Sequence, residues 1–137
     1  MTILKTLDEI KFAVDELAAK IGAPARERPT YGWSRGDGLP RIEIGDSQYH
    51  FVVEEYGREQ FRVSSDNVDE ILYHVFGGIT YDMAMDYEMQ YRVPGKDHRR
   101  LRFQRQIELL SQISPDWPTR IQDHHRELVL EYPFRDA

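Results

Sequence analysis

Three carboxylates stand close together in "TYDMAMDYEMQYR", the segment from Thr80 to Arg92. Asp82 and Asp86 are four residues apart, and this spacing places two side chains on one face of a helix. Carboxylates held in this way can bind a metal ion or exchange protons with a substrate, and His74 or His98 could complete such a site. The segment therefore suggests a small metal-dependent or acid/base enzyme that uses Asp82, Asp86 and His74 or His98.

The rest of the sequence gives this enzyme hypothesis little support. The chain has no cysteine, so it has neither a thiolate nucleophile nor a cysteine-ligated zinc site. It also lacks the His-Glu-x-x-His and Glu-x-x-His spacings of metal sites, the Gly-x-Ser-x-Gly motif, and a phosphate-binding loop with its lysine. We therefore predict a protein that is not an enzyme, with no catalytic residue, no metal site and no cofactor.

The chain is mildly acidic, with 24 Asp and Glu against 18 Lys and Arg and a formal net charge of -6. Acidic chains are repelled by nucleic acid and by anionic lipid, so the charge favours a basic protein partner over both. No apolar run approaches the roughly 20 residues that span a bilayer, and the first residues, "MTILKTLDEIKF", lack the features of a secretory leader. We expect a cytoplasmic protein that binds neither nucleic acid nor membrane; its oligomeric state stays open.

The N-terminal third is predicted to form one helix and one loop. Apolar residues recur at spacings of three and four over Ile3–Ile21, which is typical of a helix with one buried face. Gly22 is a natural end for that helix. The segment Ala23–Pro40 is rich in glycine and proline and is predicted to be a loop, with room for a short strand at Thr30–Trp33.

Three short segments follow that are rich in branched and aromatic residues. They read "RIEIG", "QYHFVVEEY" and "QFRVSS", and they are separated by Gly45-Asp46-Ser47 and Gly57-Arg58-Glu59. Short apolar runs separated by turn residues predict strands joined by hairpins. We expect a three-stranded antiparallel meander.

The C-terminal half is predicted to be helical. One helix follows Ser65, a good N-cap, and runs to about Arg92; a second covers about Asp97–Ile113 and a third about Trp117–Glu131. The pair Gly77-Gly78 lies inside the first of these helices, where it indicates a kink or a close contact with another helix. The expected fold is one α+β domain over residues 1–137, in the order α-β-β-β-α-α-α.

The carboxylates of the opening segment separate when they are placed on this helix. Asp86 falls on the apolar stripe, and a buried carboxylate needs a charged partner because its desolvation is costly. Arg99 and Arg100 lie along the stripe of the next helix, and an arginine can hold a carboxylate with two hydrogen bonds. We predict a structural ion pair of Asp86 with Arg99 or Arg100.

The opposite face of the same helix is predicted to meet solvent. It carries Tyr81, Met85, Glu88 and Arg92, with Asp82 at its border. Tyrosine, methionine and arginine are enriched at protein interfaces, although single exposed residues of this kind are also normal on any surface. These five residues are our predicted partner-binding set.

Three segments resemble a known family. They are "LYHVFGGITYDMAMDYE" (Leu72–Glu88), "DHRRLRFQRQIELLSQISPDW" (Asp97–Trp117) and "LEYPFRD" (Leu130–Asp136). Together they resemble the immunity protein 63 family of bacterial polymorphic toxin systems, over about the C-terminal two-thirds of the chain.

The resemblance implies a cytoplasmic protein that binds a cognate toxin domain and blocks it, with occlusion of the toxin's active site as the expected mechanism. It assigns no catalytic residue, and it implies that Tyr87, Arg99 and Arg100 hold the fold. The acidic composition suits a basic toxin such as a nuclease. A structural or regulatory binding domain with no toxin partner is the remaining alternative.

Overall fold

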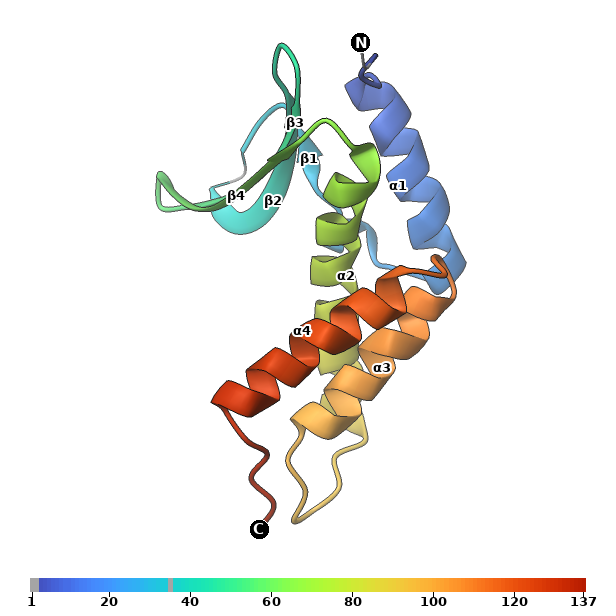
Figure 1. The fold of residues 1–137 in the computed structure, drawn as a ribbon, viewed down its shortest axis with the longest axis vertical. Helices are drawn as coiled ribbons and strands as arrows, with labels where there is room; N and C mark the ends of the chain where they lie inside the picture. Colours follow the sequence, from blue (N-terminus) through green and yellow to red (C-terminus); the bar gives the residue numbers. More distant parts are fainter. Residues whose placement is uncertain (1–2, 35) are drawn as a thin grey trace. The chain divides into compact units, whose positions relative to one another are not determined.

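The computed structural model describes residues 3–34 and 36–137 of the chain (Figure 1). The helices and strands in that part are, in order, α1 (Leu7–Ile21), the short 3-10 helix η1 (Ala25–Glu27), β1 (Thr30–Tyr31), β2 (Asp37–Ile44), β3 (Tyr49–Glu55), β4 (Arg58–Ser65), α2 (Val68–Gln90), α3 (Arg99–Ser111) and α4 (Trp117–Glu131). The predicted α+β class is confirmed.

The chain forms two compact units that share one helix. The first unit is Met1–Val75 and contains α1, the sheet and the start of α2; the second is Phe76–Ala137 and contains the rest of α2 with α3 and α4. The expectation that the whole chain is one domain stays a prediction.

Helix α1 begins at a capping box. The Thr6 hydroxyl accepts the Glu9 amide at 3.1 Å, and the Glu9 carboxylate accepts the Thr6 amide at 2.9 Å. The helix ends where Gly22 takes a left-handed conformation, with φ 67°. The predicted start at Ile3 is wrong, since the helix begins at Leu7 and Ile3 is 90% exposed. Its buried residues are Ile10, Val14, Ala18 and Ile21.

The sheet has four strands in the order β1-β2-β3-β4. The predicted meander is present as the antiparallel strands β2, β3 and β4, but β2 begins at Asp37, inside the predicted loop Ala23–Pro40. The prediction of three antiparallel strands is corrected by β1, which pairs parallel to β2 through Thr30 and Arg41. A strand of two residues is too short to show an alternating pattern, so this short element within the expected loop could be suggested but not assigned from the sequence.

The two faces of the sheet differ in character. On one face Ile42 lies opposite Phe51 and both are buried, as is Tyr49, whose hydroxyl accepts the backbone amide of Lys5 just before α1. On the other face Val52 is fully buried, although its cross-strand neighbours Arg41 and Arg62 are charged. The first face therefore belongs to the core of this unit, and the second carries charged side chains.

Helix α2 begins later than predicted and is not interrupted. Asn67, rather than Ser65, caps it, because the Asn67 side chain accepts the Asp69 amide at 2.9 Å. The helix continues through Gly77-Gly78 to Gln90. A Cβ atom added at either glycine would meet nothing within 4 Å, so the pair is not required for close packing, although the Gln106 side chain of α3 does reach the Gly77 carbonyl at 2.9 Å.

The second unit packs its three helices around an apolar core that includes the stacked rings of Phe76 and Trp117, 5.9 Å apart. Its other buried apolar residues are Ile79, Ala84, Phe103, Leu109, Leu110 and Ile121. Four polar residues are buried beside them: Thr80, Glu88, Gln106 and His125. Each of these polar side chains needs a hydrogen-bond partner, and their partners define the interior of this unit.

Candidate functional site

The buried residues of α2 in the second unit wind around the helix. Phe76, Thr80, Ala84 and Glu88 are four residues apart, and each is 0% exposed. Because four residues exceed one helical turn by about 40°, the buried line rotates by about 120° between Phe76 and Glu88. Near the C-terminal end of α2 the interior therefore lies on a different side from the one predicted by the apolar residues nearer its middle.

This rotation overturns two predictions. Asp86 was predicted to face inward, but it is exposed, and so is Gln90. Glu88 was predicted to face outward as part of the partner-binding set, but it is fully buried. Both errors have the same cause, since a straight stripe was extended through a helix whose buried side changes along its length.

Glu88 is the centre of an ion network. Its Oε1 atom accepts hydrogen bonds from Arg102 Nη2 at 2.6 Å and Nε at 3.2 Å, and its Oε2 atom accepts one from Arg92 Nε at 2.8 Å. Arg102 Nη1 also donates to the Tyr81 hydroxyl at 2.9 Å. Burial raises the pKa of Glu88, but the hydrogen bonds from the two arginines outweigh burial and hold the pKa below its usual value. The carboxylate is therefore ionised and satisfied.

Arg99 holds the fold, but not through Asp86. It pairs with Asp97 at 3.0 Å, and it donates to the backbone carbonyls of Tyr132 at 2.8 Å and Pro133 at 3.0 Å. The Arg99 guanidinium, with backbone amides, holds the pKa of Asp97 well below its usual range. Arg99 thus fastens the segment after α4 to the start of α3.

Arg100 is also engaged elsewhere than predicted. It pairs with Asp136 at 3.0 Å, and its guanidinium lies 4.1 Å from the centre of the Phe134 ring. The predicted pair of Asp86 with Arg99 or Arg100 is therefore wrong, although both arginines do have structural partners. Tyr87 is half-buried, and the centre of its ring lies 4.7 Å from the guanidinium of Arg105.

The other members of the predicted partner-binding set lie at or near the surface. Tyr81, Asp82 and Met85 are half-buried, and Arg92 is exposed. Tyr81 and Arg92 also belong to the Glu88 network, so they have a structural role in addition to any contact with a partner. Their role in binding stays a prediction.

A second set of hydrogen-bonded polar residues lies in the core of the same unit. Gln106 donates to the Gly77 carbonyl at 2.9 Å and to the Thr80 hydroxyl at 3.2 Å, and its carbonyl oxygen lies 2.7 Å from His125 Nε2. The His125 ring stacks on Phe103 with ring centres 4.0 Å apart. Gln106 is one of the residues that carry the family resemblance, but helical spacing alone does not predict its burial, because a glutamine on an amphipathic helix is usually a surface residue.

His125 is a neutral donor in this arrangement. Burial, with a smaller contribution from His124, lowers its pKa to about 4. Its Nε2 atom then carries the proton and donates to Gln106, which matches the position of the amide oxygen. The role that this geometry supports is packing rather than proton transfer.

The residues proposed for a metal or acid/base site are not brought together. Among residues 3–34 and 36–137, no group of three His, Asp or Glu side chains could hold a metal ion. His74 lies 3.2 Å from the Glu70 carboxylate and packs against the rings of Phe51 and Phe61, while His98 is exposed. The carboxylates and histidines that the enzyme hypothesis requires therefore do not form one site among the described residues.

The outer face of the sheet carries a second ion network, which the sequence patterns did not indicate. Arg41 pairs with Glu43 at 2.6 Å and with Glu54 at 2.9 Å, and Arg62 pairs with Glu59 at 2.8 Å. These side chains come from three neighbouring strands, so their proximity depends on strand register. The network makes this face of the sheet polar.

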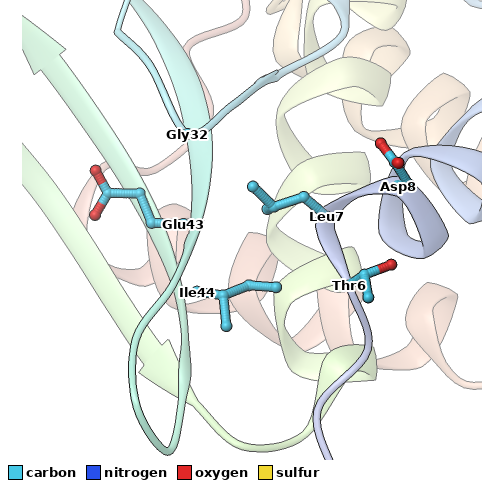
Figure 2. Close-up of a pocket in the computed structure, with 6 residues that line it drawn as sticks. All are labelled: Thr6, Leu7, Asp8, Gly32, Glu43 and Ile44. Atoms are coloured by element: carbon cyan, nitrogen blue, oxygen red, sulfur yellow. The ribbon is translucent and has the colours of Figure 1, made fainter.

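An open hollow of about 610 Å³ lies between the start of α1 and strand β2 (Figure 2). Leu7 and Ile44 point toward one another across it, and the carboxylates of Asp8 and Glu43 lie at its sides. Thr6 and Gly32 complete its lining. The described lining residues include two carboxylates and no cationic side chain, but Glu43 is already paired with Arg41 at 2.6 Å.

Most of the negative charge belongs to the first unit. Residues 1–75 contain 14 Asp and Glu against 9 Lys and Arg, whereas residues 76–137 contain 10 against 9. Within the first unit the excess is concentrated in residues 54–70, with 6 acidic residues against 2 arginines. This segment covers the end of β3, all of β4 and the start of α2.

The turn between β3 and β4 exposes an aromatic side chain. Tyr56 and Gly57 form a two-residue turn with φ 54° and φ 72°, and the side chain of Tyr56 is 90% exposed. Turns of this kind favour asparagine or glycine, because a positive φ costs other residues about 1–2 kcal/mol. A tyrosine at this position is unfavourable for folding, and its ring does not contribute to the core.

Among the described residues, no helix is both long enough and apolar enough to cross a membrane. The family model described as immunity protein 63 matches residues 45–127, which confirms the resemblance noted in the sequence. The match covers more than half of the chain, including β3, β4, α2 and α3 and most of α4. No curated protein and no solved structure matches the chain.

Proposed function

Because this chain belongs to the immunity protein 63 family, we propose that it binds a cognate bacterial toxin domain and neutralises it. The family match over residues 45–127 is the observation that carries this proposal. The chain would act by binding rather than by catalysis, as one half of a toxin and immunity pair used in contact-dependent competition between bacteria. It would protect the cell that produces the toxin.

Occlusion of the toxin's active site is the simplest mechanism for a protein that acts by binding. A chain that covers the toxin's active site needs a complementary surface and no reactive group, which suits a molecule whose interior carboxylate and histidine are held in hydrogen-bonded packing. The acidic excess of the first unit supports a basic toxin, such as a nuclease, because opposite charges speed the encounter of two proteins.

The proposed site of action is the cytoplasm of the producing cell, where a toxin acting on intracellular targets must be stopped. The sequence supports this location because, without cysteine, the chain requires no oxidising compartment for disulfide formation.

The solvent-facing part of α2 is one proposed contact surface. Of its residues, Met85 offers the simplest test, because Tyr81 and Arg92 also stabilise the Glu88 network. If this surface contacts the toxin, Met85→Glu weakens binding without loss of the ion network. Unchanged affinity of this variant would remove the surface from consideration.

Co-expression tests the function itself. The product of the gene adjacent to the one for this chain is the candidate toxin. It is produced in sensitive bacteria with and without the chain, and we expect growth only when the chain is present. A tagged chain should also retain the toxin domain through purification. Rescue of growth without a physical complex would contradict occlusion, and the absence of both rescue and complex would contradict the proposed function.

A further inference from the structure

Strand β4 is an open edge of the sheet. The strand order ends at β4, which pairs with β3 on one side and with no strand of the described residues on the other (Figure 1). Of its eight residues, only Val63 and Ser65 are partly covered and the others are exposed. An edge strand directs about half of its backbone N–H and C=O groups away from its partner, where another strand can pair with them.

This edge carries charged side chains at Arg58, Glu59 and Arg62, but along its regular part it lacks the other features by which proteins usually block such pairing. Strand β4 is as long as β2, at eight residues each, and it contains neither proline nor lysine. The irregularity in its pairing with β3 lies at the hairpin end, between Val53 and Glu54, and pairing is regular from Phe61 to Ser65. The regular part of β4 is therefore available to an added strand.

The charges beside the edge select the partner. Residues 54–70 hold 6 acidic residues and 2 arginines; of the acidic residues, Glu59 is paired with Arg62, Glu54 with Arg41 and Glu70 with His74. Glu55 and Asp66 lie at the two ends of β4 and are exposed. An approaching segment rich in lysine or arginine would be attracted to this edge, whereas an acidic one would be repelled.

Two aromatic rings lie on the same hairpin. Tyr56 at its tip is 90% exposed, and Phe61 is 47% exposed with its inner edge against Phe51 and His74. Exposed aromatic side chains are frequent anchors of protein interfaces, because they bury a large area with few rotatable bonds. Apolar contact is therefore available beside the backbone and charge contacts.

We propose that β4 is the toxin-binding edge, and that an extended basic segment of the toxin domain pairs with it as a fifth strand. This inference rests on the proposed function and adds a second contact surface, beside the one proposed on α2, and the mode of binding. Backbone hydrogen bonds to β4 hold the segment, the acidic residues at both ends of β4 attract it, and Tyr56 contacts it at the hairpin tip.

Hydrogen exchange tests the mode of binding. The chain is compared alone and in complex with the toxin domain encoded beside it. We expect the amides of residues 58–65 to exchange at least about ten-fold more slowly in the complex, because those facing outward gain a hydrogen-bond partner. Unchanged exchange across β4 in a complex that does form would overturn the proposal while leaving the proposed function intact.

A charge-reversal pair tests the surface. The variant Glu55→Lys with Asp66→Lys changes the charge at the two ends of β4, and Glu127→Lys with Glu131→Lys makes the same change on exposed positions of α4. We expect the first variant to weaken binding by at least about ten-fold and the second by less than about three-fold. Equal weakening by both variants would show only general attraction and would overturn the placement at β4.

Tyr56→Gly separates binding from folding. Glycine accepts the positive φ at this position without strain, so the variant should melt at the same temperature or higher. Its affinity for the toxin domain should nevertheless fall by about ten-fold through loss of the exposed ring. Unchanged affinity would exclude Tyr56 as an anchor. Failure of the wild-type chain to bind or protect at all would instead contradict the proposed function.

Discussion

Replacing Arg102 by methionine removes the main partner of a fully buried carboxylate. Glu88 is 0% exposed and receives two hydrogen bonds from Arg102, at 2.6 and 3.2 Å. Removing one partner of a buried ion pair costs about 3–5 kcal/mol, because the remaining charge stays out of water. Arg92, whose Nε atom lies 2.8 Å from Glu88, remains as a partner in the variant. We therefore expect the free energy of unfolding to fall by about 3 kcal/mol, the lower end of this range.

The assay is urea unfolding with a thermal melt beside it. A loss of about 3 kcal/mol lowers the melting temperature of a chain of this size by about 10 °C. Arg126→Met is the matched control, because Arg126 pairs with Asp123 at 2.8 Å while both side chains are more than half exposed. Pairs of this kind contribute little, so the control should lose less than about 0.5 kcal/mol.

The pH dependence of stability provides a second test of the pair between Glu88 and Arg102. In the wild type the pKa of Glu88 is lowered on folding, so its contribution to stability is present above the unfolded pKa of about 4.3 and is lost as the pH falls through the folded pKa. Without Arg102, burial is less opposed and the pKa of Glu88 rises. Protonation of Glu88 then removes the unpaired buried charge from the variant. The difference in the free energy of unfolding between the variant and the wild type should therefore shrink as the pH is lowered from 7 to 4.

A double variant completes the test. Glu88→Met with Arg102→Met removes both charges, so it should be more stable than Arg102→Met alone by more than about 1 kcal/mol. Either of two results would refute this account of the pair. One is a loss of stability in Arg102→Met that is no larger than in Arg126→Met; the other is a stability difference between Arg102→Met and the wild type that is the same at pH 4 and at pH 7.

Three further results are expected. Gly78→Ala should stabilise the chain by about 1 kcal/mol in urea unfolding, because glycine is unfavourable inside α2 and the added Cβ meets nothing within 4 Å; a loss of stability would mean that the backbone there is not regular helix. Thr6→Ala should cost about 1 kcal/mol by the same measurement through loss of the capping box of α1, and no change would show that the cap is frayed in solution. Because burial lowers the pKa of His125 to about 4, its imidazole signals in NMR should not titrate above about pH 5, and stability should fall as the pH drops from about 6.5 toward 4, where only the unfolded chain takes up the proton. Titration of this ring near pH 6.5 would contradict its buried position.

Local sequence patterns were sufficient to predict those parts of the structure that depend on residues close together in the chain. The end of α1 at Gly22, the strands β2, β3 and β4, and the approximate extents of α3 and α4 follow from periodicity and turn residues. The family was also recognisable, since two of its three motif segments lie mainly in α2 and α3. The match over residues 45–127 agrees with the extent of the resemblance except for the last segment, Leu130–Asp136, which lies beyond it.

The partners of the charged residues could not be predicted in the same way. A buried carboxylate of α2 does meet an arginine of α3, but the pair is Glu88 with Arg102 and not the predicted Asp86 with Arg99 or Arg100. A straight stripe of apolar residues does not show that the buried side of α2 rotates. A rotation of that kind depends on which helix packs against each turn, and sequence spacing carries no information about it.

The sequence by itself determined the fold class, the kinds of residue available and the family of this protein, because these depend on composition, periodicity and local motifs. Tertiary structure decided which charges are buried together, that β4 is left as an open edge, and that the turn beside it carries an exposed tyrosine with φ 54°. The physical reason is that burial and strand order arise from contacts between residues far apart in the chain.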